Sequence, residues 1–331
     1  MKILWTHNFN PRKLNAGVFM YTAADGIRSL GVDIDLEYLG NLRSPRNILN
    51  ARKRLIKISG NYDVVHAQYG SACAFTTAAI QNCPKVLSLR GSDWNIHRSS
   101  MGYLYWHTRM ARLMTRAVIK KYDHVITVSN RMTKELNKYF PSVSTGSFPS
   151  PIDLDRFVPM ERMLARRSLG FPDCNGKWVL FNSLDRNNPI KRISLAEQAI
   201  EIANRRMGNI KLRVASGLPF SEIPIFVASC DLALCTSENE GWPNSVKEAL
   251  ACNIPFIATD VSDLSDIAEK ESSCRICPPD PGVIADNICD VVSMPKPNNL
   301  RRYVLDMDLG KSSRKLLALY TRMIENGKTD Q

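Results

Sequence analysis

Residues 232–259, LALCTSENEGWPNSVKEALACNIPFIAT, predict a strand, a helix and a second strand in succession. Leu232–Cys235 and Phe256–Thr259 are short runs of apolar and small residues, a composition typical of buried strands. Between them, Ser245–Cys252 has the apolar spacing of a helix. Strands that are joined through a helix lie parallel in one sheet, so this stretch predicts an α/β fold.

The ends of this helix are also marked in the sequence. We expect a start at Pro243 or Asn244, since proline suits the first helical turn, with Asn244 or Ser245 as the cap. At the other end, Asn253 suits the left-handed residue that ends many helices, and Pro255 prevents continuation. The helix therefore begins close to the end of the first strand, with its free N–H groups beside that edge of the sheet.

Both halves of the chain repeat this alternation, which predicts two doubly wound, Rossmann-like α/β domains with a cleft between them. The Pro-rich segment Phe148–Asp153 interrupts the pattern and is the expected hinge. A length of 331 residues also fits two domains better than one. We place the domains at 1–155 and 156–311, followed by a final helical stretch at 312–331. The expected strands are Lys2–Thr6, Val32–Tyr38, Val64–Ala67, Lys85–Leu89, His124–Val128, Trp178–Asn182 and Ile210–Ala215, and the expected helices include Phe19–Leu30, Ile193–Arg206 and Ser312–Ile324.

The composition is that of a water-soluble protein, and we expect it in the cytoplasm. No apolar run approaches the ~20 residues of a membrane-spanning helix, and the opening MKILWTHN reads as a strand rather than as a signal peptide. The nine cysteines lack the spacing of a metal site, because the C-x-x-C of Cys274 and Cys277 has no second pair or histidine cluster. No bound metal is expected.

Positive charge is concentrated in the first half of the chain. Residues 1–160 hold 22 Lys and Arg against 10 Asp and Glu, whereas residues 161–331 hold 22 of each. Two stretches, Arg46–Ile58 and Tyr103–Lys121, mix these cations with apolar side chains at helical spacing. Such helices suit an anionic membrane surface, and they equally suit a core-facing stripe with a solvated basic face. Anionic lipid, a phosphorylated acceptor or nucleic acid would match the excess of charge.

Two glutamates lie near the helix start in the opening stretch. Glu240 is on the loop just before the helix, and Glu248 lies about one turn inside it. A helix N-terminus beside a strand end offers N–H groups and a positive dipole to phosphate or sugar oxygens. A carboxylate at Glu248 is able to accept hydrogen bonds from a ribose diol. Taken alone, however, both residues are more simply solvated glutamates near a helix start.

Their context changes this interpretation. Glu240-x7-Glu248, within EGWPNSVKEALA, closely resembles the signature of family-4 retaining glycosyltransferases of the GT-B architecture. One such pair is a weak signal, but other segments along nearly the whole chain resemble family segments in family order. They are LSLRGSDW (87–94), ITVSNRMTKEL (126–136), FPSPIDLDRFVP (148–159), SEIPIFVASCDLALCTS (221–237) and PFIATDVSD (255–263).

The resemblance implies roles for residues of the second half. In this family, the glutamate that matches Glu248 holds the nucleotide ribose, and the one that matches Glu240 contacts the donor sugar with N–H groups of the following loop. An Arg and a Lys neutralise the diphosphate; Lys191 matches the Lys, and Arg186 is our candidate for the Arg. The implied donor-binding residues are Arg186, Lys191, Gly241, Trp242, Asn244, Ser245 and Glu248.

In the first half, the resemblance implies two loops near the substrates. Gly17 matches a glycine loop that approaches the donor phosphate or the acceptor, although Ala16 replaces a second glycine of the family. Arg90 stands where many members carry a histidine, and Asp93 is the acidic residue of the same loop. The catalytic residues implied by the resemblance are Glu240, Arg90 and Asp93.

The reaction implied by the resemblance is transfer of a sugar from a nucleotide diphosphate sugar to a hydroxyl group, with retention and without a metal. The expected acceptor is a lipid-linked glycan of surface polysaccharide assembly, met at the inner face of the plasma membrane. The final helix, 312–331, is expected to cross back onto the first domain.

Two alternatives remain at this point. A sugar-nucleotide 2-epimerase of the same architecture would act on the donor without an acceptor. A basic nucleic-acid-binding protein would use the charged half, but the sequence lacks a helix-turn-helix, RNP-type or zinc-finger signature. We therefore expect no nucleic-acid partner, and the oligomeric state stays open.

Overall fold

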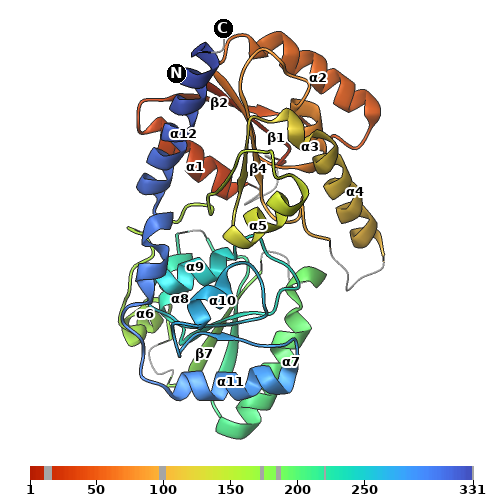
Figure 1. The fold of residues 1–331 in the computed structure, drawn as a ribbon. Helices are drawn as coiled ribbons and strands as arrows, with labels where there is room; N and C mark the ends of the chain where they lie inside the picture. Colours follow the sequence, from red (N-terminus) through yellow and green to blue (C-terminus); the bar gives the residue numbers. More distant parts are fainter. Residues whose placement is uncertain (11–16, 97–101, 172–174, 184–187, 220, 330–331) are drawn as a thin grey trace. The chain divides into compact units, whose positions relative to one another are not determined.

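The computed structural model describes residues 1–331 except 11–16, 97–101, 172–174, 184–187, 220 and 330–331. The chain folds into two compact α/β units (Figure 1). Unit 1 comprises Met1–Pro151 and Leu309–Gln331, and unit 2 comprises Ile152–Asp308. The first boundary falls four residues before the expected one, and the final segment of unit 1 begins three residues earlier than expected.

Unit 1 is built on a six-stranded sheet in the order β2-β1-β3-β4-β5-β6, and all its neighbouring strands are parallel. Trp5 of the inner strand β1 pairs with Leu36 on one side and with His66 on the other. The strands are β1 (Lys2–His7), β2 (Asp33–Tyr38), β3 (Val64–Ala67), β4 (Lys85–Leu89), β5 (His124–Thr127) and β6 (Thr145–Ser147). The helices are α1 (Val18–Arg28), α2 (Pro45–Ser59), α3 (Ser71–Thr77), α4 (Tyr103–Val118), α5 (Asn130–Tyr139) and α12 (Leu309–Thr329), with a 3-10 turn η1 (Ile119–Lys121).

Helices cover both faces of this sheet. Ile3 and Trp5 face a core that contains residues of α1 and α12, whereas Leu4 between them faces a core that contains residues of α2, α3 and α5. Burial on both faces explains why the strands read as nearly continuous apolar runs.

Helix α12 brings the far end of the sequence into the core of unit 1, where it packs on α1 (Figure 1). The Trp5 indole donates to the Tyr320 hydroxyl at 3.0 Å, and His66 Nδ1 lies 2.5 Å from the same oxygen. All three side chains are buried. A Cβ atom at Gly26 of α1 would lie 2.7 Å from Leu309, so the two helices approach closely at a glycine. The C-terminal helix is therefore an integral part of unit 1.

Unit 2 contains a five-stranded parallel sheet in the order β11-β10-β9-β7-β8. The chain runs from β7 out to β8 and then returns to β9 on the other side of β7, so the strand order reverses between β7 and β9. Open α/β sheets bind ligands at the carboxyl ends of strands at such a switch point. The strands are β7 (Lys177–Asn182), β8 (Ile210–Ala215), β9 (Leu232–Cys235), β10 (Phe256–Ala258) and β11 (Arg275–Ile276). The helices are α6 (Arg162–Ser168), α7 (Ile193–Met207), α8 (Ile223–Ala228), α9 (Asn244–Ala251), α10 (Leu264–Ala268) and α11 (Pro281–Ser293), with 3-10 turns η2 (Pro189–Lys191) and η3 (Leu300–Met307).

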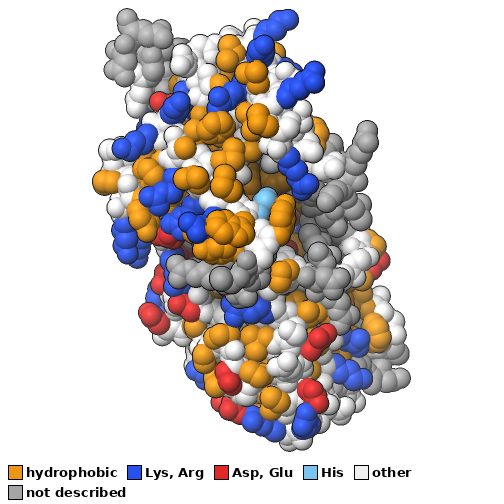
Figure 2. All heavy atoms as spheres, turned by 90° about the vertical axis from the view of Figure 1, so that its right-hand side faces the viewer, with side chains coloured by type: hydrophobic (Ala, Val, Ile, Leu, Met, Phe, Trp, Pro, Cys, Tyr) orange, Lys and Arg blue, Asp and Glu red, His pale blue; other side chains and the backbone are white. Residues whose placement is uncertain are grey.

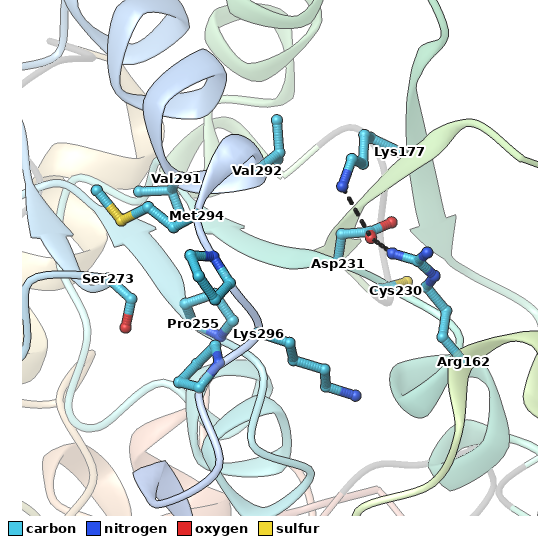
Figure 3. A pocket seen from close by; sticks show the side chains of 12 residues that line it. Arg162, Lys177, Cys230, Asp231, Pro255, Ser273, Val291, Val292, Met294 and Lys296 are labelled. Carbon is cyan, nitrogen blue, oxygen red and sulfur yellow. Dashed lines mark hydrogen bonds and ion pairs between the residues drawn. The ribbon is translucent and has the colours of Figure 1, made fainter.

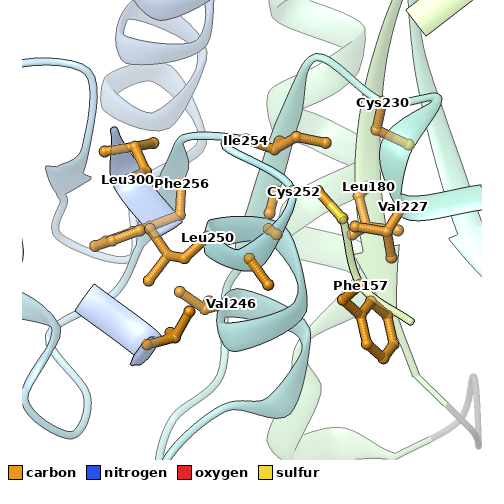
Figure 4. Close-up of a cluster of buried hydrophobic side chains, with 14 of the residues drawn as sticks. Phe157, Leu180, Val227, Cys230, Val246, Leu250, Cys252, Ile254, Phe256 and Leu300 are labelled. Atoms are coloured by element: carbon orange, nitrogen blue, oxygen red, sulfur yellow. The ribbon is translucent and has the colours of Figure 1, made fainter. Parts of the chain in front are cut away.

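The sheet of unit 2 also separates two cores. Leu180 of β7 packs in a cluster with Leu250 of α9 (Figure 4), while its neighbour Val179 faces α7 and α11. Cys274 belongs to the first core and Cys277 to the second, and both side chains are buried. The C-x-x-C thiols therefore lie on opposite sides of the sheet, on either side of the short strand β11.

Candidate functional site

Two loops of unit 2 meet at the switch point, one after β7 and one after β9. The Thr236 hydroxyl donates to the Lys191 carbonyl at 2.7 Å, and the Glu238 N–H donates to the Ile190 carbonyl at 2.8 Å. Just beyond β10, the Thr259 hydroxyl donates to the Ser237 carbonyl at 2.5 Å. These bonds hold the segment of Lys191 against the loop that leads to Glu240.

Lys191 and Glu240 form an ion pair at this point. Lys191 Nζ lies 2.5 Å from Glu240 Oε1, and the Ser237 hydroxyl donates to the same oxygen at 2.7 Å. Only 27% of the Lys191 side chain and 16% of the Glu240 side chain are exposed. Burial alone would lower the pKa of Lys191, but the Glu240 carboxylate outweighs it and the pKa is raised. Lys191 therefore stays positively charged at neutral pH and is able to balance the charge of a bound anion.

Glu248 lies on α9 beside the end of β7. The Asn182 side-chain amide donates to Glu248 Oε2 at 3.3 Å. Burial raises the pKa of Glu248 to about 7, even though Lys247, Asn182 and Lys191 act in the opposite direction. A half-buried carboxylate of this kind gains from further hydrogen-bond donors, such as the two hydroxyls of a diol.

The N-terminus of α9 faces the loop of Glu240. The helix begins at Asn244, its N-cap is Pro243, and no side chain caps it. The prediction that Asn244 or Ser245 caps the helix is therefore wrong, because proline occupies the cap position. The first N–H groups of a helix have no partner within it, so those of Asn244 and Ser245 are suited to an anionic ligand. At the other end, Asn253 has the predicted left-handed backbone, with φ at 57°.

The loop at Gly241 and Trp242 is held by a hydrogen bond from Ser262. The Ser262 hydroxyl donates to the Gly241 carbonyl at 2.6 Å, and Ser262 itself has φ at 57°. Glycine is the residue that adopts such a left-handed backbone most readily. The Trp242 side chain is only 7% exposed and packs in the core of unit 2.

Two residues of the site were not predicted, and one predicted residue lies outside the described part of the chain. Asn182 contacts Glu248 and Ser237 contacts Glu240, as given above. Asn182 ends strand β7, and a polar residue at that place is the signal that could have found it. Arg186 falls among the residues that the structure does not describe. Within the described residues, no group of three or more His, Cys, Asp and Glu side chains is arranged to hold a metal.

In unit 1, Arg90 lines a small cavity of about 40 Å³ together with His66, Gln68 and Ser150. Its guanidinium donates to Gln68 Oε1 at 2.7 Å and to the Ser150 hydroxyl at 3.3 Å, and it lies 4.8 Å over the Phe19 ring. Burial lowers the pKa of Arg90 to about 10, so the side chain stays cationic near neutral pH. Its predicted contact with a substrate stays a prediction.

Asp93 has a structural task in this loop, and its predicted catalytic role stays a prediction. Its side chain is fully buried, and its carboxylate accepts the N–H groups of Gly70 at 2.7 Å, Arg90 at 2.9 Å and Gly91 at 2.9 Å. Burial raises the pKa of Asp93, while these backbone bonds act against that shift. The carboxylate holds the loop of Arg90 in place, and both of its oxygens are used within the protein.

The backbone conformation and the close packing at position 17 both require a glycine. It precedes α1 with φ at 78°, and a Cβ atom there would lie 2.9 Å from the Phe9 ring. A side chain at this position would therefore collide with Phe9, and the predicted approach of Gly17 to a substrate stays a prediction. Ala16 lies outside the described residues.

A separate cavity of about 90 Å³ opens at the amino-terminal edge of the unit 2 sheet (Figure 3). It is lined by Asp231, which precedes β9 and accepts from Arg166 and from the Trp178 N–H, both at 2.8 Å. Arg162 and Lys177 pair with the same carboxylate (Figure 3). This edge is opposite the switch point, and its cations pair with Asp231 within the protein, so we assign the cluster to stability.

Comparison with protein families gives the class of this site. A model described as Glycosyltransferase Family 4 matches residues 5–156, and one described as Glycosyl transferases group 1 matches residues 194–305, which include Glu240 and Glu248. The fold is that of a GT-B glycosyltransferase. The chain belongs to glycosyltransferase family 4.

Individual relatives agree with this class. The chain is 27% identical over 264 residues to a protein of Bacillus subtilis named for teichuronic acid biosynthesis, TuaC, with 73% of this chain and 65% of that protein covered. The match thus spans just under two thirds of the relative. An uncharacterized glycosyltransferase of Methanocaldococcus jannaschii is 22% identical over 315 residues, with 89% of this chain and 78% of the relative covered.

Solved structures share the fold. Sucrose-phosphate synthase from Thermosynechococcus elongatus superposes with a TM-score of 0.76 at 15% identity, covering 98% of this chain and 99% of that one. Anabaena HepE, in complex with UDP and glucose, superposes with a TM-score of 0.68 at 13% identity, covering 97% and 100%.

Proposed function

We propose that the chain transfers a sugar from a nucleotide diphosphate sugar to a hydroxyl acceptor with retention of anomeric configuration. The observation that carries the proposal is the group of Lys191, Glu240 and Glu248 at the switch point of unit 2. A cation near a helix N-terminus suits a diphosphate, and a half-buried carboxylate suits a ribose diol. The UDP and glucose bound to Anabaena HepE support a nucleotide sugar as the donor.

In this proposal, different residues of unit 2 bind different parts of the donor. Lys191 balances the charge that develops on the departing diphosphate, and the N–H groups at the start of α9 add donors that are already oriented. The two contacts of Glu240 described above both use Oε1, which leaves Oε2 to accept from a sugar hydroxyl. Glu248 accepts from the ribose.

The reaction breaks the bond between the anomeric carbon and the diphosphate oxygen, and it forms a bond from that carbon to the acceptor oxygen on the same face. The acceptor proton passes to the leaving phosphate oxygen, so no protein nucleophile is required. Arg90 in unit 1 is the candidate to hold an acceptor hydroxyl or phosphate.

The acceptor proposed here is a lipid-linked glycan of surface polysaccharide assembly, and the teichuronic acid assignment of the Bacillus relative supports that choice. The enzyme would meet it at the cytoplasmic face of the plasma membrane. Incubation of labelled nucleotide sugars with a membrane lipid extract tests this directly, by transfer of label to lipid. Epimerised donor and free nucleotide, formed equally without lipid, would instead identify a 2-epimerase.

Replacing Glu248 by alanine is expected to weaken nucleoside diphosphate binding by about 10- to 150-fold, because a hydrogen bond to a charged group contributes roughly 1.5–3 kcal/mol. Wild-type affinity is also expected to rise as the pH increases through about 7, since the diol favours the ionised carboxylate whose pKa burial has raised. Calorimetric titration across this pH range measures both effects.

Glu248→Gln is the matched control, because it keeps the shape and removes the titration. The terminal phosphate of the nucleotide also titrates near pH 6, but it affects both proteins alike. The ratio of the wild-type affinity to the affinity of Glu248→Gln therefore reports the titration of Glu248 alone. This ratio should fall by up to about tenfold per pH unit below pH 7. A ratio that does not change with pH, or an unchanged affinity in Glu248→Ala, would reject the ribose role.

Turnover is expected to survive chelation by EDTA, since Lys191 and the N-terminus of α9 supply the positive charge that the leaving diphosphate needs. The assay compares initial rates with and without EDTA, followed by addition of Mg²⁺ or Mn²⁺. Complete loss of turnover that either ion restores would contradict this mechanism.

A further inference from the structure

Helix α4 presents a ridge of large apolar side chains to solvent. Tyr103, Trp106, Met110 and Leu113 are 74, 59, 53 and 60% exposed. Spacings of three and four residues place them on one face of the helix. The residues that α4 buries against unit 1 are Thr108, Ala111, Thr115 and Val118. The ridge therefore does not face the core, which was one of the two alternatives left by the sequence. An exposed apolar patch of this kind marks an interaction surface.

The charged residues of the helices that carry this surface are all basic, although Glu135 of α5 pairs with Arg112 of α4 at 2.9 Å. Neither α2 nor α4 contains an aspartate or glutamate, and η1 adds Lys120 and Lys121 directly after α4. Arg109 lies 5.3 Å from the Trp106 ring and 5.5 Å from the Tyr105 ring, so a cation borders the ridge itself. This combination of exposed aromatic and aliphatic side chains with arginine and lysine is complementary to anionic lipid.

Helix α2 supports the same surface on a smaller scale. It exposes Leu49 and Ile56 to 53 and 54%, and α3 lies between it and α4. Figure 2 shows this side of unit 1, where hydrophobic and basic side chains are interspersed. Two arginines of α2 are bonded within unit 1. Arg52 donates to the Phe75 carbonyl at 2.7 Å, and Arg54 pairs with Glu37 at 2.5 Å. The exposed ridge of α4 is therefore the stronger element.

We propose that α4 docks unit 1 on an anionic lipid surface, with its apolar ridge in the headgroup region and its cations at the lipid phosphates. Tryptophan and tyrosine favour that region because each has an apolar ring and a polar group. A soluble polyanion would match the cations but would leave the ridge in water. Among the described residues, no helix is both long and apolar enough to span a membrane, and docking on the surface needs none. The inference rests on the proposed function, in which a lipid-linked acceptor lies on that surface.

The inner face of α4 connects the ridge to the loop of Arg90. The Thr115 hydroxyl oxygen accepts from the Ser71 N–H at 2.7 Å and lies 3.1 Å from the Asp93 carbonyl. Arg112 lies 4.8 Å over the Trp94 ring. Docking of the outer face would therefore fix the position of the Arg90 loop above the lipid surface.

Tryptophan fluorescence tests the insertion directly. Of the five tryptophans, Trp106 is 59% exposed, and the other four are between 0 and 7% exposed. We expect a blue shift of the emission and quenching by brominated lipids on phosphatidylglycerol vesicles, neither of which phosphatidylcholine vesicles produce. Trp106→Phe should abolish the response. An unchanged emission under conditions where the wild-type protein sediments with the vesicles would overturn the proposal.

Co-sedimentation supplies the second measurement. Trp106→Ser with Leu113→Ser should weaken binding to phosphatidylglycerol vesicles by about 10- to 100-fold, because apolar burial contributes to surface binding. The matched control is Leu164→Ser with Leu305→Ser, which changes side chains that are 54 and 42% exposed in unit 2. An equal loss in the control, or no wild-type binding at low salt, would overturn the proposal. So would binding to heparin without binding to vesicles.

Nucleotide affinity separates this proposal from the function it rests on. The ridge variants should bind nucleoside diphosphate as the wild type does, since their substitutions lie in unit 1 and Lys191 and Glu248 lie in unit 2. Vesicle binding by a protein that binds no nucleotide sugar would leave the docking surface in place and reject the proposed function.

Discussion

Replacing Lys191 by alanine is expected to lower kcat by about 10²–10³-fold, the loss that follows removal of one oriented group at a developing charge. The leaving diphosphate would lose the ammonium that lies 2.5 Å from Glu240. Glu240, with 16% of its side chain exposed, would also remain as an uncompensated carboxylate beside an anionic donor. Both effects raise the barrier, and single-turnover kinetics with saturating donor measure it separately from binding.

Two variants control this experiment. Lys191→Arg keeps the positive charge but replaces the compact ammonium by a planar guanidinium. Its kcat should therefore lie between those of Lys191→Ala and the wild type. Lys270→Ala removes an exposed lysine from the same unit and should leave kcat unchanged. Loss of folding is excluded if the circular dichroism of Lys191→Ala matches that of the wild type. A folded Lys191→Ala enzyme with the wild-type kcat would remove this residue from the mechanism.

Replacing Asp231 by alanine is expected to destabilise unit 2 by about 3–5 kcal/mol, the usual result of removing one partner from a buried ion pair. Asp231 accepts from Arg166, whose side chain is completely buried, and from the Trp178 N–H at the start of β7. The substitution leaves the Arg166 charge without its carboxylate in the interior. Urea denaturation followed by far-ultraviolet circular dichroism measures the change.

The matched control is Asp286→Ala, which breaks an aspartate–arginine pair on the surface of the same unit. Asp286 and Arg206 are 62 and 46% exposed, so this change should cost less than about 1 kcal/mol. Equal effects of the two substitutions would show that the Asp231 cluster is no more than a surface feature. Replacing Arg166 as well, by methionine, should recover part of the stability, because no buried charge is then left unpaired.

The fold could be predicted from the sequence because burial on both faces produces a strong local signal. Each strand named from the sequence is present, and the helix predicted around Ser245–Cys252 begins at Asn244, one of the two expected starts. The strands not predicted are β6, Thr145–Ser147, and β11, Arg275–Ile276. They are short, lie at the edges of their sheets and lack an apolar run, so only their pairing with a neighbour defines them.

The candidate site was predicted less completely, because its contacts are tertiary. The resemblance placed Lys191, Glu240 and Glu248, but nothing local in the sequence indicates that Asn182 reaches Glu248 across 66 positions. Asp93 was expected near the substrates, whereas the structure uses its carboxylate to hold backbone N–H groups. The count of charged residues in the first half also cannot predict which cations are exposed. It does not distinguish Arg52, which is bonded within unit 1, from an arginine in solvent.

The place of α12 in the core of unit 1 determines the order in which the protein can be completed on the ribosome. Unit 2 lies between the two segments of unit 1, so synthesis of Ile152–Asp308 must finish before α12 appears. At 5–20 residues per second, this interval lasts roughly 8–30 s. During that time Trp5 and His66 lack the Tyr320 hydroxyl, and the face of α1 around Gly26 is uncovered. Unit 2 is contiguous and can therefore finish folding first, although it is translated second. A transcript that stops before Leu309 would yield a folded unit 2 joined to an unfinished unit 1, which chaperones and proteases would remove.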